Sequence, residues 1–221
     1  MKIKSTRSVV LTLAAIVLIA ATVAGTVAYL TASSEKVENT FTVGNVEITL
    51  DEAKVDDDGK AVSPEQRVEA NRYHLIPGKT YDKDPTVTVK ADSEDCYVRV
   101  IVTIPQYAAL QTVTGNTFLP ENYVEGWDPA VWPCVYADGN GKYEFRYYQK
   151  VTKSDTDTEL TLFTTFKVPG ELTGEDLATI FGGATDAQTL CVIEAHAIQA
   201  EGFASADEAW TAFEIQKGTN P

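Results

Sequence analysis

The feature that most constrains the fold is a series of short segments in which apolar and polar residues alternate. In the clearest of them every second residue from Val98 to Ile104 is a valine or an isoleucine, and Arg99 and Thr103 lie between these positions. A period of two is typical of a β-strand, because successive side chains of a strand point to opposite faces of its sheet. The same alternation predicts further strands in residues 45–50, 86–90, 143–151, 160–168 and 191–198.

Turn sequences separate these segments. Residues 56–59 and 138–141 are rich in aspartate, asparagine and glycine, which tolerate the positive φ angles of tight turns. Residues 51–72 as a whole are acidic and poor in large apolar side chains, so we expect them to be the least structured part of the chain.

Helices are expected at only two places. Thr173 with Asp176 has the spacing of a helix N-cap, and Ser205 with Glu208 has that of a better capping box, each ahead of a short apolar stripe. Many short strands with few helices favour an all-β fold, namely an antiparallel jelly-roll sandwich with one or two short helices.

The N-terminus has the layout of a secretory signal. Three basic residues precede an uncharged stretch from Val9 to Ala28, and cleavage between Ala28 and Tyr29 would follow suitably small residues. The alternative is a signal helix that is not cleaved and stays attached as a membrane anchor, because about 20 apolar residues can span a bilayer. The predicted organisation is a signal peptide at 1–28, an N-terminal extension at 29–43 and a sandwich domain at 44–221.

The charge of the chain restricts its partners. The 18 Lys+Arg against 32 Asp+Glu give a formal net charge of −14, which becomes −17 without residues 1–28. Such an acidic surface argues against a nucleic-acid partner and suits a secreted protein at the cell surface. Membrane contact is expected only through an uncleaved signal segment. No cofactor is predicted, apart from weak Ca²⁺ binding by the acidic surface as a whole.

No metal centre or catalytic residue is assigned. The chain has 2 histidines and lacks the HExxH motif that places two imidazoles on one zinc ion. Glu194 and His196 are weak metal candidates because they share one face of a predicted strand, although such pairs are more often plain surface. Residues 56–65 partly match an EF-hand loop, but Lys54 occupies the first ligand position, which favours an acidic turn.

Three cysteines leave at least one thiol unpaired within the chain. Cys191 falls on the inward face of its predicted strand, Cys96 begins a strand, and Cys134 in a loop is the most exposed candidate. A disulfide between Cys96 and either of the other two is consistent with the sequence, which does not choose between them.

An aromatic group lies in one proline-containing loop. Tyr123, Trp127 and Trp132 are suited either to stacking on a sugar or partner, or to capping one end of the sandwich, and the second interpretation is favoured.

The extension at 29–43 is too polar to form a stable element alone. Its apolar residues are Tyr29, Leu30, Val37, Phe41 and Val43, of which the last three keep a period of two. Such a segment can act as an additional strand, and the sheet edge that it pairs with belongs either to the same molecule or to a neighbour. Donation to a neighbour is a head-to-tail contact, which propagates into a filament unless it closes into a ring.

Several short motifs resemble one family. They are GTVAYLT at residues 25–31, NTFTVGNV at 39–46, LIPGKT at 75–80, KDP at 83–85 and YVRV at 97–100. Together they are similar to the N-terminal half of the TasA/camelysin family, exported proteins of Gram-positive bacteria. The family usually has Phe where Leu30 stands here and an Asp-containing pair at residues 31–32.

The resemblance implies a jelly-roll subunit of extracellular biofilm matrix fibres that is processed by a dedicated SipW-type signal peptidase. In that family the mature N-terminal strand completes the sheet of the adjacent subunit, so the donor strand would run from Tyr29 to about Phe41. The implied partners are further copies of the chain and other matrix proteins.

Two rival functions come from other classes. One is a cell-surface metalloprotease of the camelysin type, which would depend on His74 or His196. The other is a surface adhesin or sugar-binding module, which would depend on Trp127 or Trp132.

Overall fold

The structure is a computed structural model that describes residues 32–34, 40–41, 45–63, 65–115, 118–181 and 191–218. The expected signal segment at 1–28 and the cleavage site between Ala28 and Tyr29 lie outside the described residues, as do Leu30, Val37 and Val43.

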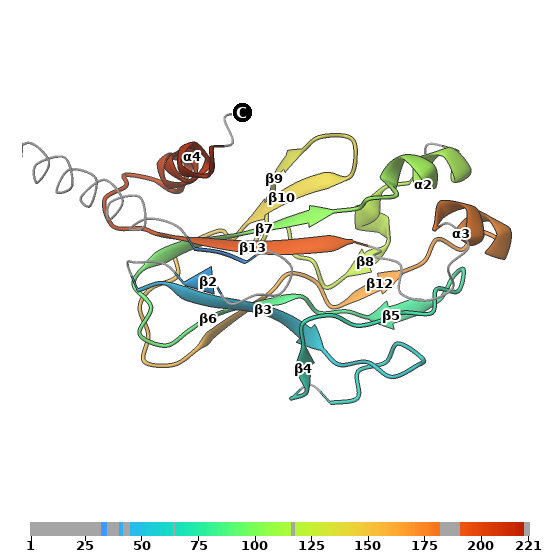
Figure 1. Ribbon diagram of the computed structural model, residues 1–221, viewed down its shortest axis with the longest axis horizontal. Coiled ribbons are helices and arrows are strands. Elements are labelled where there is room, and N and C mark those ends of the chain that lie inside the picture. The colour runs from blue at the N-terminus through green and yellow to red at the C-terminus, as the bar shows by residue number, and fades with distance from the viewer. Residues whose placement is uncertain are drawn as a thin grey trace, which may run out of the picture.

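Antiparallel β-sheet dominates the described part of the chain, as the alternation predicted (Figure 1). The largest sheet has the strand order β1-β13-β7-β10-β9. Its strands are β1 (Ala32–Ser34), β13 (Val192–Gln199), β7 (Cys96–Thr103), β10 (Lys142–Arg146) and β9 (Cys134–Ala137). β13 and β7 form its centre, because they pair over all eight residues of β13.

The second sheet faces the first. Its order is β11-β6-β3-β2, and a short strand, β4, pairs with the far end of β3. The strands are β11 (Thr158–Thr161), β6 (Thr86–Val89), β3 (Glu47–Ala53), β2 (Thr40–Phe41) and β4 (Arg67–Val68). A third, three-stranded sheet continues one end of the molecule with the order β5-β12-β8. It consists of β5 (Thr80–Asp82), β12 (Thr165–Lys167) and β8 (Val124–Glu125).

One hydrophobic core fills the space between the two large sheets. Val98 and Val100 of β7 and Ala195 of β13 belong to the same buried cluster as Ile48 of β3 and Val87 of β6. This cluster confirms the predicted inward faces of these strands, whose alternate residues are removed from water.

A second core lies at the end of the molecule where the third sheet and two helices meet. The helices are α2 (Tyr107–Val113) and α3 (Gly174–Ile180), which lie side by side in Figure 1, and a 3-10 turn, η1 (Pro120–Asn122), is nearby. Tyr81 is fully buried there and stacks on Phe166 with ring centroids 5.1 Å apart. The sequence did not predict α2.

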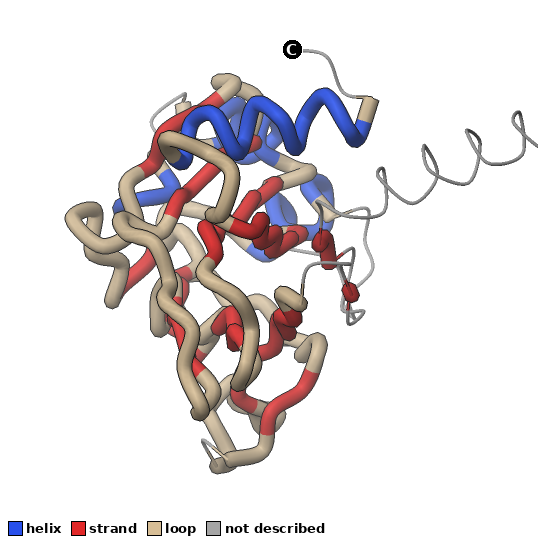
Figure 2. The backbone as a smooth tube through the Cα atoms, turned by 90° about the vertical axis from the view of Figure 1, so that its left-hand side faces the viewer, coloured by secondary structure: helices blue, strands red, loops and turns tan. Residues whose placement is uncertain are grey.

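The longest helix, α4 (Ala206–Lys217), covers the outer face of the largest sheet (Figures 1 and 2). Its predicted N-cap is confirmed, because the Ser205 side chain accepts a hydrogen bond from the Glu208 amide at 3.2 Å. The capping box is not completed, because the Glu208 carboxylate accepts from the Ala204 amide at 2.8 Å. The predicted cap of α3 is also confirmed, as a capping box formed by Thr173 and Asp176.

Three predictions about local structure are wrong. The strand predicted over residues 143–151 ends at Arg146, and Val151 forms only an isolated bridge with Cys96. Residues 160–168 form two strands in different sheets, because Leu162 and Phe163 are consecutive buried residues and break the alternation. Residues 51–72 are well tied to the sheet. The Arg67 guanidinium forms ion pairs with Asp51 at 2.8 Å and Asp84 at 2.6 Å, which hold β4 beside β3.

Glycine is required at one turn for two reasons at once. Gly59 has φ +72°, and a Cβ atom placed there would lie 2.2 Å from the ring of buried Tyr81. Gly139 has nearly the same φ, +71°, with no atom within 4 Å of an added Cβ. A side chain at Gly139 would therefore cost only backbone strain, whereas a side chain at Gly59 would add a steric overlap with Tyr81.

Replacing Gly139 with Ala should lower the free energy of unfolding by about 1 kcal/mol, the cost of the left-handed backbone alone. Gly59→Ala should lower it by about 3 kcal/mol or more, because Tyr81 cannot move without disrupting the second core. Urea denaturation of the two variants checks this expectation, and equal losses would contradict the steric argument.

Candidate functional site

The N-terminal extension contributes one short strand to each of the two facing sheets. β1 pairs antiparallel with β13, with Ala32 opposite Ala197, Ser33 opposite His196 and Ser34 opposite Ala195. β2 pairs with β3, with Thr40 opposite Ile48 and Phe41 opposite Glu47. Phe41 is thus the one predicted donor residue that falls in a described strand.

These strands occupy edges that would otherwise be unpaired. In the strand order of the described residues β1 follows β13 and β2 follows β3, while β4 pairs only with the far end of β3. β13 and β3 are themselves neighbours across the sandwich. We refer to β1, β2 and the edges of β13 and β3 with which they pair as the N-terminal seam. The seam joins through three residue pairs on one side and two on the other, so it is a small, backbone-mediated contact.

A charged residue is buried on the outer face of the largest sheet, on the strand that pairs with the other edge of β13. Arg99 of β7 is 2% exposed and lies between the rings of Trp210 and Phe213 of α4, 4.5 and 4.6 Å from their centroids. The guanidinium also forms ion pairs with Glu214 of α4 and with Glu144 of β10. Buried charge is tolerated when it is paired in this way, and here the pairing fixes α4 to the sheet.

His196, one of the two weak metal candidates, belongs to this cluster. Its Nδ1 atom accepts a hydrogen bond from Arg99 Nε at 3.1 Å, and Lys217 Nζ lies 3.3 Å from Nε2. Burial, with the nearby positive charges of Arg99 and Lys217 as further causes, lowers the pKa of His196 to about 2. A ring whose accepting nitrogen is occupied and whose neighbours are cations is poorly suited to binding a metal ion.

The other metal candidates find no support either. Within the part of the chain that the structure describes, no three His, Cys, Asp or Glu side chains lie close enough to hold an ion. Asp56 instead stabilises its own turn, because its carboxylate accepts hydrogen bonds from the amides of Asp58 at 3.0 Å and Lys60 at 2.9 Å. The acidic turn favoured by the sequence is therefore confirmed. His74 is exposed ahead of β5 and has no contact in common with His196.

The three cysteines are free thiols. Cys96 is buried at the start of β7, and burial raises its pKa to about 12. Cys134 is exposed, as predicted, but it begins the edge strand β9 rather than lying in a loop. Cys191 precedes β13, and its half-buried side chain contacts both hydrophobic cores.

The three aromatic residues of the predicted loop all make contacts within the protein. Trp132 is 1% exposed, and its indole N–H donates to the Thr161 carbonyl at 2.9 Å. Trp127 donates to the Trp132 carbonyl at 2.8 Å and packs edge-on against Phe145. The Tyr123 hydroxyl donates to Glu171 at 2.7 Å. Their hydrogen bonds and ring contacts link this loop to the cores.

Sequence reasoning missed a buried ion pair next to the second core. Lys83 Nζ lies 2.5 Å from a Glu52 carboxylate oxygen, and both side chains are almost fully buried. Glu52 is also anchored to the loop before β5, since its other oxygen accepts the Asn71 amide at 2.9 Å. The pair joins residues 31 positions apart, so no local spacing signals it.

Comparison of the chain with protein-family models, with curated proteins and with solved structures finds no match in any of the three.

None of the helices in the described ranges is long and apolar enough to cross a membrane.

The burial of His196 predicts a pH-dependent stability. Its pKa is lower in the folded than in the unfolded protein, so unfolding takes up a proton at any pH between the two values. The free energy of unfolding should therefore fall by about 2 kcal/mol between pH 7 and pH 5. His196→Gln keeps an acceptor for Arg99 and should flatten this slope, whereas exposed His74→Gln should retain it. Denaturant titrations at each pH measure the effect, and a wild-type slope in His196→Gln would contradict it.

Proposed function

We propose that this chain is an exported, noncatalytic structural subunit of the jelly-roll class that assembles into extracellular matrix fibres by strand donation. The observation that carries the proposal is the N-terminal seam, in which one short segment supplies an edge strand to both facing sheets. The resemblance of residues 25–104 to the TasA/camelysin family supports the same conclusion.

The seam favours exchange between molecules for an energetic reason. Each backbone hydrogen bond contributes about 1 kcal/mol net, so release of three pairs at β13 and two at β3 costs only a few kcal/mol. The same segment of a neighbouring molecule forms identical bonds with the vacated edges. Because donor segment and receiving edge lie on different molecules, the contact is head-to-tail and propagates into a fibre.

Export and charge fit this role. Removal of residues 1–28 by a SipW-type signal peptidase would free the segment at its N-terminal end and leave a net charge of −17. Mutual repulsion at that charge keeps monomers apart at low ionic strength, and salt or divalent cations should favour assembly by screening it. In this proposal the partners are further copies of the chain and other matrix proteins.

Deletion of residues 29–41 from the mature chain should abolish fibres in electron micrographs, because the donor segment is lost. A synthetic peptide of residues 29–43, added to the truncated protein, should raise its melting temperature without restoring fibres, since the peptide fills both edges but carries no further subunit. Fibres of normal yield from the truncated protein would refute the mechanism.

Disulfide trapping identifies the molecule that provides the strand. Ala32→Cys and Ala197→Cys are placed on two separate chains, both carrying Cys134→Ser, and the chains are mixed during assembly. Because the two positions are opposite each other in the seam, covalent dimers should appear on a non-reducing gel. Ser34→Cys paired with Ala197→Cys is two residues out of register and is the matched control. Fibres that form without in-register dimers would show that assembly uses another contact.

A further inference from the structure

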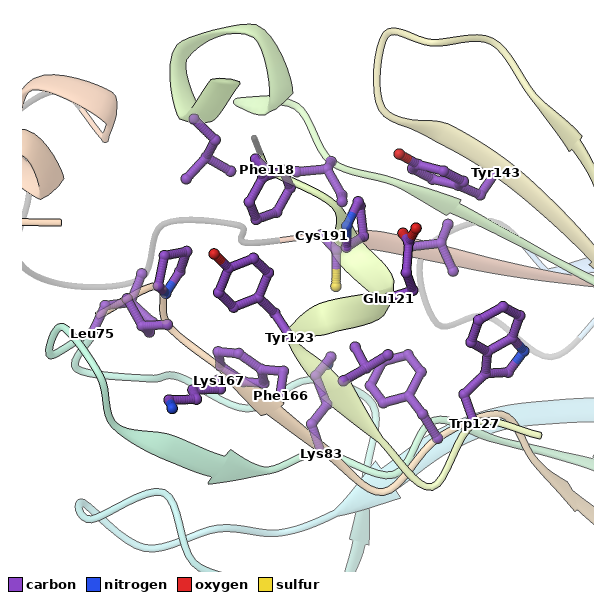
Figure 3. A pocket seen from close by; sticks show the side chains of 18 of the residues that line it. Leu75, Lys83, Phe118, Glu121, Tyr123, Trp127, Tyr143, Phe166, Lys167 and Cys191 are labelled. Carbon is purple, nitrogen blue, oxygen red and sulfur yellow. The ribbon is translucent and has the colours of Figure 1, made fainter. Parts of the chain in front are cut away.

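A cavity of about 310 Å³ lies between the two hydrophobic cores, away from the N-terminal seam (Figure 3). Residues of both cores line it, including Leu162 of the first core and Phe166 of the second. Val124 and Cys191 contact both clusters and also line the cavity. The cavity therefore lies at the junction of the two cores. Its size falls within the range of small-molecule sites in proteins.

The lining of the cavity is mainly carbon. Figure 3 shows Leu75 and Trp127 on opposite sides of the group of lining side chains, with Tyr123 and Phe166 between them. Most of the other lining residues are aliphatic or aromatic. An apolar cavity that is large enough for a ligand and stays empty forfeits dispersion contacts along its whole wall, so an apolar occupant would be stabilising.

The polar groups of the lining are engaged or balanced by neighbours. Lys83 is neutralised by Glu52 at 2.5 Å. The Tyr123 hydroxyl is bound to Glu171, whose pKa is lowered first by that bond and also by the charge of Lys167. Glu121 adds a further negative charge to the lining. No unbalanced positive charge therefore remains for an anionic ligand, and the acidic surface as a whole repels one.

We propose that this cavity binds one uncharged molecule with a single alkyl chain of about ten to twelve carbons. The size follows from the volume, since an apolar cavity of about 150 Å³ accommodates one benzene ring and 310 Å³ therefore holds roughly twelve carbon atoms. The lining reaches from Leu75 on one side to Trp127 on the other, and a flexible alkyl chain can follow a lining of this extent. A lipid with two long chains exceeds the volume.

Binding can be measured with primary alcohols from hexanol to hexadecanol, by displacement of the neutral fluorophore N-phenyl-1-naphthylamine from the mature protein. Each added methylene should increase the affinity about fourfold up to ten to twelve carbons, beyond which the gain should stop. Absence of displacement, or an affinity that keeps rising through hexadecanol, would overturn the proposal.

Variants of the lining locate the binding site. In Figure 3 the sulfur of Cys191 lies within the cavity, so Cys191→Phe should occupy part of it and weaken decanol binding at least tenfold. Cys191→Ser keeps the volume and is the matched control. Should Cys191→Phe fail to fold by circular dichroism, Leu177→Trp on the α3 side of the cavity carries the same test. Unchanged decanol affinity in a folded, filled variant would overturn the assignment.

Two further experiments test the charge of the ligand and whether its alkyl chain belongs to a free molecule or to a membrane lipid. Dodecanoate should bind more weakly than dodecanol, because Glu121 and Glu171 repel a carboxylate, and tighter binding of dodecanoate would overturn the uncharged assignment. Phosphatidylcholine vesicles should not co-sediment with the protein, since the cavity holds one short chain. Binding to vesicles without binding to decanol would overturn the proposal in favour of a membrane contact. None of these outcomes depends on fibre assembly, because the lining contains no residue of the N-terminal seam.

Discussion

The hydrogen-bonding capacity of the edge of β13 is the constraint on which the rest of the molecule depends. β13 is paired with β7 along its whole length, and it provides Ala195 and Ala197 to the inner core. On the outer face it provides His196 and Ile198 to the contact with α4. A strand with this many roles cannot leave its second edge open without inviting pairing by another chain. The N-terminal segment meets that requirement with only three residue pairs, and this imbalance makes exchange a reasonable proposal.

The outer face of the same strand explains why α4 is part of the fold. Arg99 is buried between Trp210 and Phe213 and paired with acidic side chains, so removing the helix would remove the Glu214 partner and both ring contacts and would expose the apolar outer face of the sheet to water. α4 and the N-terminal seam therefore both depend on the position of β13 and β7, one through packing on a face and the other through pairing at an edge. A change that shifts these two strands is expected to affect both.

The sequence predicted the elements whose signal is local. Alternation located the inward faces of β3, β6, β7 and β13, and the caps of α3 and α4 were found from Thr173 and Ser205. It failed where partners are distant in the chain. The acidic composition of residues 51–72 suggested weak structure. Arg67 nevertheless forms ion pairs with Asp51 and with Asp84, which lies between β5 and β6.

The candidate site shows the same division. The sequence predicted that the extension adds a strand to a sheet edge of the same molecule or of a neighbour, but only the topology shows that its described strands, β1 and β2, pair with β13 and β3. Arg99 was assigned to the outer face correctly, but its burial requires α4, which approaches from more than 100 positions along the chain. The cavity between the cores has no local sequence signal, because its lining residues are spread over the chain from Leu75 to Cys191.

The pKa values also indicate which condition would best favour the proposed assembly. Acid neutralises surface carboxylates only well below pH 5, and hydrogen bonds with ion pairing lower the pKa of several of them further, including Asp95 and Asp157. The buried His196 begins to disfavour the folded state already as the pH falls below about 6.5. Moderate acid therefore destabilises the fold before it removes the charge repulsion between subunits. Divalent cations screen the same repulsion without protonating His196, so they should favour assembly while the cluster of Arg99, His196 and α4 stays intact.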